Sequence, residues 1–162
     1  MEDIFIINTG GTFNKIYNKI SGELDVDKSN STLKEIAKKW QAKLNFVSII
    51  GKDSLDFTDS DRQELLQAIK KSKYKKIVVI HGTDTIDLSA KYVAESIDDK
   101  SVVFTGAMVP FWIDKVEATA NFAMALGYCK CAKNGVYIAL NGVVGEYKEI
   151  VKDRELGLFK RV

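Results

Sequence analysis

The chain has little of what usually marks a disulfide-bonded or metal-binding protein. Its 162 residues include one proline, one histidine and two cysteines. Cys129 and Cys131 are too few to hold a metal by themselves, and the histidine, His81, lies far away in the sequence. We therefore expect two reduced cysteines, no metal and no cofactor, as in a cytoplasmic protein.

Long apolar runs are also missing, which excludes a membrane-spanning helix. The acidic start has neither the basic region nor the cleavage site of a signal peptide. We find no repeats and no linker rich in proline and serine, so 162 residues with 46% hydrophobic content predict one globular domain. The net charge is only +2. The lysine cluster at 70–76 lacks accompanying arginines and aromatics, and it indicates a helix end and turn rather than a nucleic-acid surface.

Short apolar runs alternate with helical patterns along the whole chain. Strands are expected at 4–8, 45–50, 77–80, 101–104 and 136–140. Helices are expected at 33–40, from 59 onward, at 86–96 and at 117–130. This alternation predicts an α/β fold: a three-layer α/β/α architecture with a mostly parallel, Rossmann- or flavodoxin-like sheet.

Each expected strand runs into a small, polar or glycine-containing segment. These segments are 9–12, 51–54, 81–85, 105–107 and 141–142. In parallel sheets ligands bind beyond the carboxyl ends of the strands, so five such endings indicate a lined crevice. Neither Gly-x-Gly-x-x-Gly nor Gly-x-x-x-x-Gly-Lys-Ser/Thr is present, which disfavours a phosphate or nucleotide binder.

The first ending is Thr-Gly-Gly-Thr, residues 9–12. Its glycines, including Gly11, allow positive φ and a close approach of the backbone to a small ligand. The hydroxyl of Thr12 can make a turn hydrogen bond or act as a nucleophile. Residue physics by itself favours the turn.

The third ending is His-Gly-Thr-Asp-Thr, residues 81–85. Asp84 can cap the helix that follows. Beside Thr83, it can instead help to activate a nucleophile or bind an amino group. His81 follows an apolar run, which favours a structural histidine over a general base.

Together these two motifs resemble the signatures of bacterial-type asparaginases and glutaminases, amidohydrolases that work through a threonine nucleophile. Further similar segments occur in the same order as in the family: SLDF at 54–57, FTGAMVP at 104–110, EATAN at 117–121 and GVYIALN at 135–141. The resemblance covers almost the whole chain. It implies a single asparaginase N-terminal-like domain over 1–162, with the family's C-terminal domain absent.

The resemblance implies roles for individual residues. Thr12 matches the first catalytic threonine, the usual nucleophile, and Thr83 matches the second. Counting without gaps from Gly135 puts the family's lysine at Lys152, as a base near the Thr83 hydroxyl. Backbone N–H groups near both threonines would stabilise the oxyanion.

Substrate binding follows in the same way. Asp84 and Ser54 would hold the α-amino and α-carboxylate groups, next to the backbone of Gly11. Tyr17 is the candidate for the family's loop tyrosine, although it lies closer to Thr12 than that tyrosine usually does. The segment 18–23 would then be a hinged turn.

Two departures affect substrate recognition. Leu55 stands where the family often has a polar residue, and Val109 replaces the arginine of its Met-Arg-Pro motif. We expect an amidohydrolase that converts an asparagine-like side-chain amide to acid and ammonia. The alternative is a catalytically weak or inactive module that senses an amino acid. The resemblance also implies a homodimer or homotetramer. The apolar segment 108–113 either makes such a contact or folds onto the core of its own domain.

Overall fold

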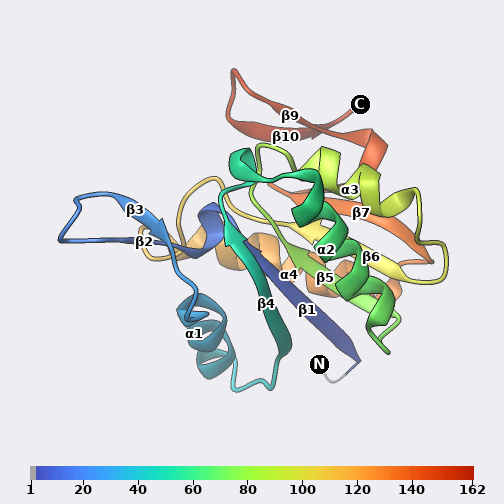
Figure 1. Cartoon of the computed structure of the whole chain (residues 1–162), viewed down its shortest axis with the longest axis horizontal. Coiled ribbons are helices and arrows are strands. Elements are labelled where there is room, and N and C mark those ends of the chain that lie inside the picture. Colours follow the sequence, from blue (N-terminus) through green and yellow to red (C-terminus); the bar gives the residue numbers. More distant parts are fainter. Residues whose placement is uncertain (1–2) are drawn as a thin grey trace.

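A computed structural model describes residues 3–162 as three layers built on a six-stranded sheet (Figure 1). The strand order is β4-β1-β5-β6-β7-β8. The strands are β4 (Asn45–Lys52), β1 (Ile4–Gly10), β5 (Lys76–Ile80), β6 (Ser101–Thr105), β7 (Gly135–Leu140) and β8 (Val143–Glu146). All pair in parallel except β8, which is antiparallel to β7. The predicted, mostly parallel α/β sheet is confirmed.

The helices cover both faces of the sheet because neighbouring strand residues point in opposite directions. On β1, Ile6 packs in a cluster with α1 (Ser31–Lys39) and α4 (Lys115–Cys131). Ile7 packs in the other cluster, with α2 (Asp59–Lys71) and α3 (Ile86–Ala94). The buried, apolar strands thus have a helical layer on each side, as their sequences predicted.

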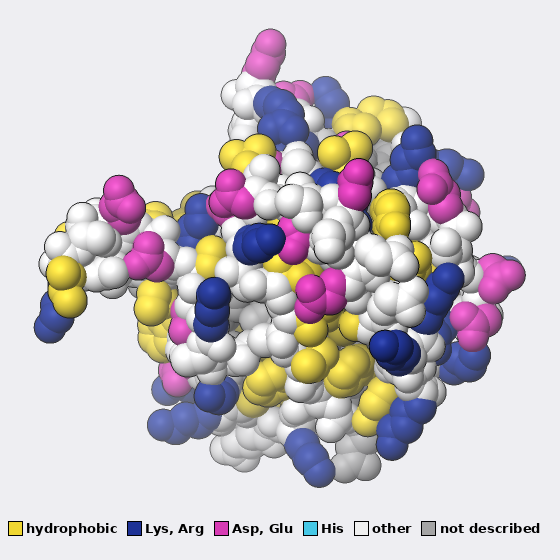
Figure 2. Space-filling model, in the orientation of Figure 1, with side chains coloured by type: hydrophobic (Ala, Val, Ile, Leu, Met, Phe, Trp, Pro, Cys, Tyr) yellow, Lys and Arg dark blue, Asp and Glu magenta, His cyan; other side chains and the backbone are white. Residues whose placement is uncertain are grey.

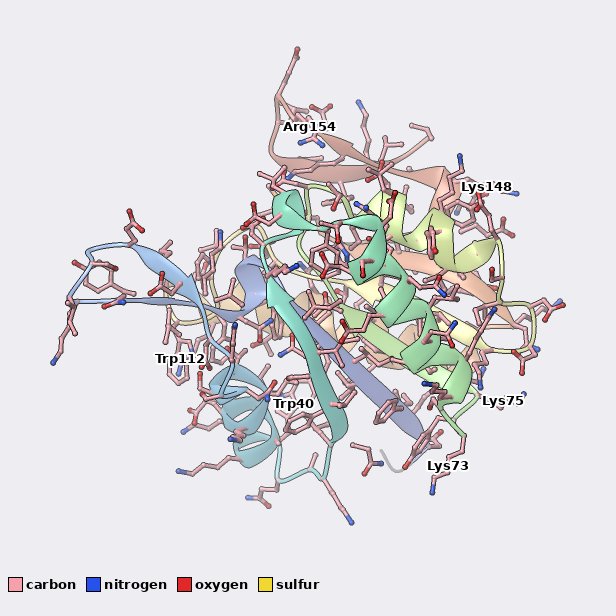
Figure 3. The ribbon with its side chains drawn as sticks, viewed as in Figure 1. Trp40, Lys73, Lys75, Trp112, Lys148 and Arg154 are labelled. Carbon is pink, nitrogen blue, oxygen red and sulfur yellow. The ribbon has the colours of Figure 1, made fainter. Side chains whose placement is uncertain are left out.

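Local signals set the helix ends. At the start of α2, Asp61 N donates to Thr58 Oγ1 over 3.3 Å, and Thr58 N donates to Asp61 Oδ2 over 2.8 Å, which forms a capping box. At its end, the lysine cluster occupies the last turn of α2 and the connection to β5, where Figure 3 labels Lys73 and Lys75. The predicted helix end and turn are confirmed.

Several short elements were not predicted. A hairpin of β2 (Lys15–Tyr17) and β3 (Leu24–Val26) projects from the body (Figure 1). A second hairpin, β9 (Ile150–Asp153) and β10 (Leu158–Arg161), crosses the end of the molecule. Single 3₁₀ turns follow three of the sheet strands: η1 (Thr12–Asn14), η2 (Ser54–Asp56) and η3 (Tyr147–Glu149).

The strand order identifies the part of the sheet edge where a ligand is expected. Numbered along the chain, the five parallel strands are arranged 2-1-3-4-5, the flavodoxin-like order. The connection after β1 leads to β4 on one side, whereas the connection after β5 leads to β6 on the other side, so the strand order reverses between β1 and β5. In this topology ligands bind beyond the carboxyl ends of those two strands. Both threonine motifs follow them directly, one after β1 and one after β5.

Candidate active site

The two threonine motifs meet at the carboxyl ends of β1 and β5. Thr9 Oγ1 donates to Ile80 O over 2.8 Å and joins the two strand ends. A Cβ built on Gly11 would lie 2.5 Å from the Cα of Gly82, so the two loops touch through their backbones. Gly11 also has a φ of 73°, which an L side chain rarely adopts. Thr12 and Thr83 each follow one of these glycines.

Thr12 opens η1 and is half-buried. Within residues 3–162 no group makes a hydrogen bond to its hydroxyl, so the turn hydrogen bond favoured by the residues alone is not formed. The remainder of that turn is held by other atoms, with Asn14 N donating to Gly11 O over 3.0 Å. The Thr12 hydroxyl is therefore free to contact a ligand.

Lys152 reaches the second motif from β9. Its Nζ donates to Thr83 Oγ1 over 2.9 Å and to Asp84 Oδ1 over 2.8 Å. The Lys152 side chain is only 13% exposed, and Thr83 is 4% exposed. Such a short, poorly solvated contact between an amine and a hydroxyl suits proton transfer. The structure thus brings together Thr83, Asp84 and Lys152, which the resemblance had grouped.

Asp84 does not cap α3. The residue at the cap position is Thr85, without a side-chain cap bond, while Asp84 faces two cations. Arg154 Nη1 donates to Asp84 Oδ1 over 3.2 Å, and Arg154 Nη2 donates to Asp84 O over 2.9 Å. Arg154 was not predicted from the sequence. The only sequence signal for a role of this arginine was its position two residues after Lys152, in a charged stretch that is typical of a solvated turn.

Hydrogen bonds of Ser54 join the end of β4 to the second motif. Its Oγ accepts from Thr85 N over 3.3 Å, and its carbonyl accepts from Thr85 Oγ1 over 2.8 Å. A Cβ on Gly82 would lie 2.5 Å from Ser54 Oγ, so this packing requires glycine there. Ser54 is fully buried, whereas its neighbour Leu55 is 69% exposed. The apolar side chain noted as a departure therefore faces solvent beside the site.

His81 is buried scaffolding, as expected. Its ring packs against Phe57 and Phe104, with centroids 4.5 and 6.0 Å away. Burial lowers its pKa to about 4, so the ring is neutral near pH 7. Nδ1 lies 2.8 Å from Gly82 O and must carry the hydrogen, because a carbonyl can only accept. This bond holds the loop that carries Thr83.

Tyr17 is not brought to these residues. It lies on β2 of the projecting hairpin, pairs with Leu24 and is 66% exposed. The turn beyond it is closed by hydrogen bonds from Gly22 N to Asn18 O and from Asn18 N to Glu23 O, both 2.8 Å long. Its role as the loop tyrosine stays a prediction.

A polar network that the sequence analysis did not assign supports the neighbouring strand ends. Glu117 accepts from the backbone N–H groups of Met108 and Val109, each over 2.9 Å. Asn121 donates to Gly106 O over 3.0 Å and accepts from Asn141 N over 2.9 Å. The network fixes the ends of β6 and β7 from helix α4. Its residues lay in segments matched to the family, but their partners could not be read from spacing.

A cavity of ≈ 130 Å³ opens beside the second motif. Its walls combine charged and apolar side chains, from Thr83, Asp84, Ile86, Asp87, Val151, Lys152, Arg154 and Phe159. Within residues 3–162 no three histidine, cysteine or acidic side chains are grouped to hold a metal ion. Over the same residues, no helix has the length and apolar character needed to cross a membrane.

Comparisons with known proteins agree with this architecture. A family model described as "Asparaginase, N-terminal" matches residues 3–155. Among curated proteins, an L-asparaginase of Thermococcus kodakarensis is 24% identical over an alignment of 160 residues that covers 96% of this chain and 49% of that protein. A 60 kDa lysophospholipase of Mus musculus is 38% identical over an alignment of 69 residues that covers 38% of this chain and 12% of that protein.

Solved structures show the same fold. The thermostable L-asparaginase from Thermococcus kodakarensis superposes with a TM-score of 0.85 at 24% identity, over 98% of this chain and 51% of that chain. A probable cytoplasmic L-asparaginase from Campylobacter jejuni gives a TM-score of 0.80 at 26% identity, over 98% and 52%. The chain thus spans about half the length of these relatives.

Proposed function

The chain belongs to the asparaginase family, and on that premise we propose that it is an amidohydrolase that cleaves a small, asparagine-like side-chain amide to acid and ammonia. The observation that carries this proposal is the 2.9 Å contact of Lys152 Nζ with Thr83 Oγ1. It lies beside the loop of Thr12, whose hydroxyl makes no hydrogen bond within residues 3–162. A buried amine aimed at one hydroxyl near a second, free hydroxyl suits two-step acyl transfer.

In the proposed first step, Thr12 Oγ attacks the amide carbon and the C–N bond breaks. The Thr12 proton leaves on the nitrogen, and ammonia departs. Because Lys152 donates to Thr83 Oγ1, the Thr83 hydroxyl hydrogen can point into the site. The pair can therefore relay that proton without a net change in its own protonation.

In the second step water attacks the acyl-threonine. Its OH stays on the released acid, and its other proton returns to Thr12 Oγ. Backbone N–H groups near Thr12 and Thr83 would stabilise the oxyanion in both steps. These groups are preorganised by the glycine contact between the two loops.

Ser54, Asp84 and Gly11 are the proposed substrate-binding residues. Ser54 Oγ accepts from Thr85 N and is fully buried, so it would donate its own hydrogen to a substrate oxygen only if the neighbouring loop moved. Tyr17 would contribute only if the β2–β3 hairpin folded toward the site. We also propose a cytoplasmic location and a homodimer or homotetramer. The segment 108–113, where Ile113 is 63% exposed, is the candidate contact.

The alternative is a weak or inactive amino-acid-binding module. Such a module would use Ser54 and Asp84 but would have no use for the Lys152–Thr83 pair. A panel of asparagine, glutamine and dipeptide amides, tested for ammonia release by the chain, separates the two. Release from at least one amide supports the enzyme. A shift of melting temperature without release from any amide supports the binding module.

A further inference from the structure

One asparagine joins the β7–β8 turn to the hairpin that carries Lys152. Asn141 and Gly142 form the two-residue turn between β7 and β8, with φ of 51° and 80°. Asn-Gly is a preferred sequence for such a turn, because both residues take positive φ. The turn itself makes no use of the Asn141 side chain, yet Asn141 Oδ1 accepts from Phe159 N of β10 over 3.2 Å. This contact therefore needs a reason beyond the turn.

The Asn141 side chain is also held at its other end. Its Nδ2 donates to Glu117 Oε1 over 3.2 Å, and Glu117 is fixed in turn by the backbone N–H groups of Met108 and Val109. Because a carboxylate only accepts and a backbone N–H only donates, the amide cannot flip without losing both of its contacts. Helix α4 thus supports the β9–β10 hairpin through Asn141.

Phe159 lies directly opposite Lys152 in the β9–β10 ladder. In an antiparallel ladder, hydrogen-bonded pairs alternate with pairs that have no hydrogen bonds between them. Val162 N donates to Glu149 O over 2.9 Å at the end of this ladder, so the Phe159–Lys152 pair, three positions along, is of the second kind. The Phe159 N–H therefore points away from β9, toward Asn141. The two side chains of the pair lie close together on one face.

This pair forms part of the site. Both Phe159 and Lys152 line the cavity of ≈ 130 Å³ beside the second motif. Phe159 is 3% exposed, in the core cluster with α2 and α3, while Lys152 Nζ reaches Thr83 Oγ1. A shift of β10 at Phe159 would move the lysine opposite it. A displacement of about 1 Å at a catalytic group can cost on the order of 100-fold in rate.

We infer that Asn141 is a positioning residue for Lys152. It holds β10 at Phe159, and thereby keeps Lys152 Nζ within hydrogen-bond distance of Thr83 Oγ1. Asn141 does not line the cavity and acts only through the hairpin. The inference rests on the proposed function for its kinetic readout only, because the position of Lys152 can be measured without turnover.

The kinetic test uses Asn141→Gly, because glycine keeps the positive φ of the turn and removes both side-chain contacts. The kcat for ammonia release should fall about tenfold or more, with KM changed by less than about twofold. In the Lys152→Met background, Asn141→Gly should cause no further loss of kcat, because it acts through the lysine. A loss of similar size in both backgrounds would overturn the inference.

Ser101→Ala is the matched control for a general loss of stability. Ser101 is buried at the amino end of β6, and its Oγ donates to Lys133 O over 2.8 Å, at the opposite end of the sheet from the site. This variant should lower the melting temperature and leave kcat unchanged. A similar fall of kcat in Ser101→Ala would mean that Asn141 acts through stability alone.

A second measurement needs no substrate. Brief treatment with acetic anhydride, read by mass spectrometry, should acetylate Lys152 about fivefold faster in Asn141→Gly, as expected for loss of one partly buried hydrogen bond. Lys100 is the internal reference, since it is 5% exposed and donates to Ser72 O over 2.8 Å. An unchanged rate at Lys152 overturns the inference. Faster acetylation in a chain that releases no ammonia from any amide would reject the proposed function and keep the role of Asn141.

Hydrogen exchange of the unmodified chain keeps the inference testable if Asn141→Gly does not fold. The N–H groups of Phe159 and Arg161 both point away from β9, and of the two Asn141 accepts from Phe159 alone. Phe159 N–H should exchange on the order of tenfold more slowly than Arg161 N–H. Equal rates would mean that Asn141 does not hold β10.

Discussion

Lys152 Nζ lies 2.9 Å from Thr83 Oγ1, although 69 positions separate the two residues in the chain. Thr83 follows β5 in the middle of the sheet, whereas Lys152 lies on β9, beyond the β8 edge. The turn η3 and the β9–β10 hairpin bring the lysine back over the carboxyl ends of the strands (Figure 1). The contact therefore depends on the whole fold. Variants that keep the fold can test the chemistry of the contact separately from the stability of the protein.

Replacing Lys152 with methionine keeps the length of the side chain and removes the amine. We expect kcat for ammonia release to fall at least about 100-fold, because a positioned acid–base group contributes that much or more. Lys160→Met is the matched control, since Lys160 lies on the same hairpin and pairs with Asp153 over 2.8 Å. Steady-state kinetics of both variants check this. Equal losses in the two would argue against a catalytic lysine.

Gly11→Ala should destabilise the protein more than Gly22→Ala. Both glycines have positive φ, 73° and 76°, so both substitutions strain the backbone by about 1–3 kcal/mol. Only at Gly11 would the added Cβ meet another backbone, at 2.5 Å, whereas nothing lies within 4 Å at Gly22. We expect a further loss of about 2 kcal/mol at Gly11, the range of overpacked sites. Urea unfolding measures both, and equal values would contradict the contact between the loops.

His81 should make stability depend on pH in a defined window. Its pKa is about 4 in the folded protein, lowered by burial from 6.5, so the unfolded chain binds more protons between these values. The contribution of the buried neutral ring is complete above pH 6.5 and is lost as pH falls toward 4, by about 3 kcal/mol.

The His81→Gln variant isolates this effect from that of the carboxylates. Its free energy of unfolding, followed from pH 7 to pH 4, should decline less steeply than that of the unmodified chain. Parallel declines would mean that the buried imidazole is not the group responsible.

The sheet and its helices could be predicted because their signals are local. Continuous apolar runs such as 77–80 identify buried parallel strands, and 3-4 spacing identifies the helices. The three- and four-residue strands of the two hairpins were not predicted because such short segments show no clear period, and β3 and β10 are mostly exposed. Strand order could not be predicted either, since periodicity carries no information about which strands pair.

The site was predictable only in part. Thr12, Thr83 and Asp84 stand at strand ends, where polar residues indicated a lined crevice, but their candidate roles came from the family resemblance. Lys152 has no local signature, and only the register of a similar family indicated it. Arg154 looked like one charge among several, because the residues alone do not show that the β9–β10 turn faces Asp84.

The distribution of surface charge bears on the kind of ligand that the protein binds. On the face drawn in Figure 2, basic and acidic side chains are interspersed, without a stripe of one sign. A nucleic acid is a polyanion and needs a basic footprint, which this face does not present. The small-molecule substrate stays a prediction.

The most direct test of the amidohydrolase proposal is ammonia release by Thr12→Ala and Thr12→Ser beside the unmodified chain, each checked for an unchanged melting temperature. Thr12 makes no side-chain hydrogen bond within residues 3–162, so neither variant should unfold the protein. The account predicts no release by Thr12→Ala and measurable release by Thr12→Ser, which keeps a nucleophilic hydroxyl. Turnover by Thr12→Ala equal to that of the unmodified chain would contradict it.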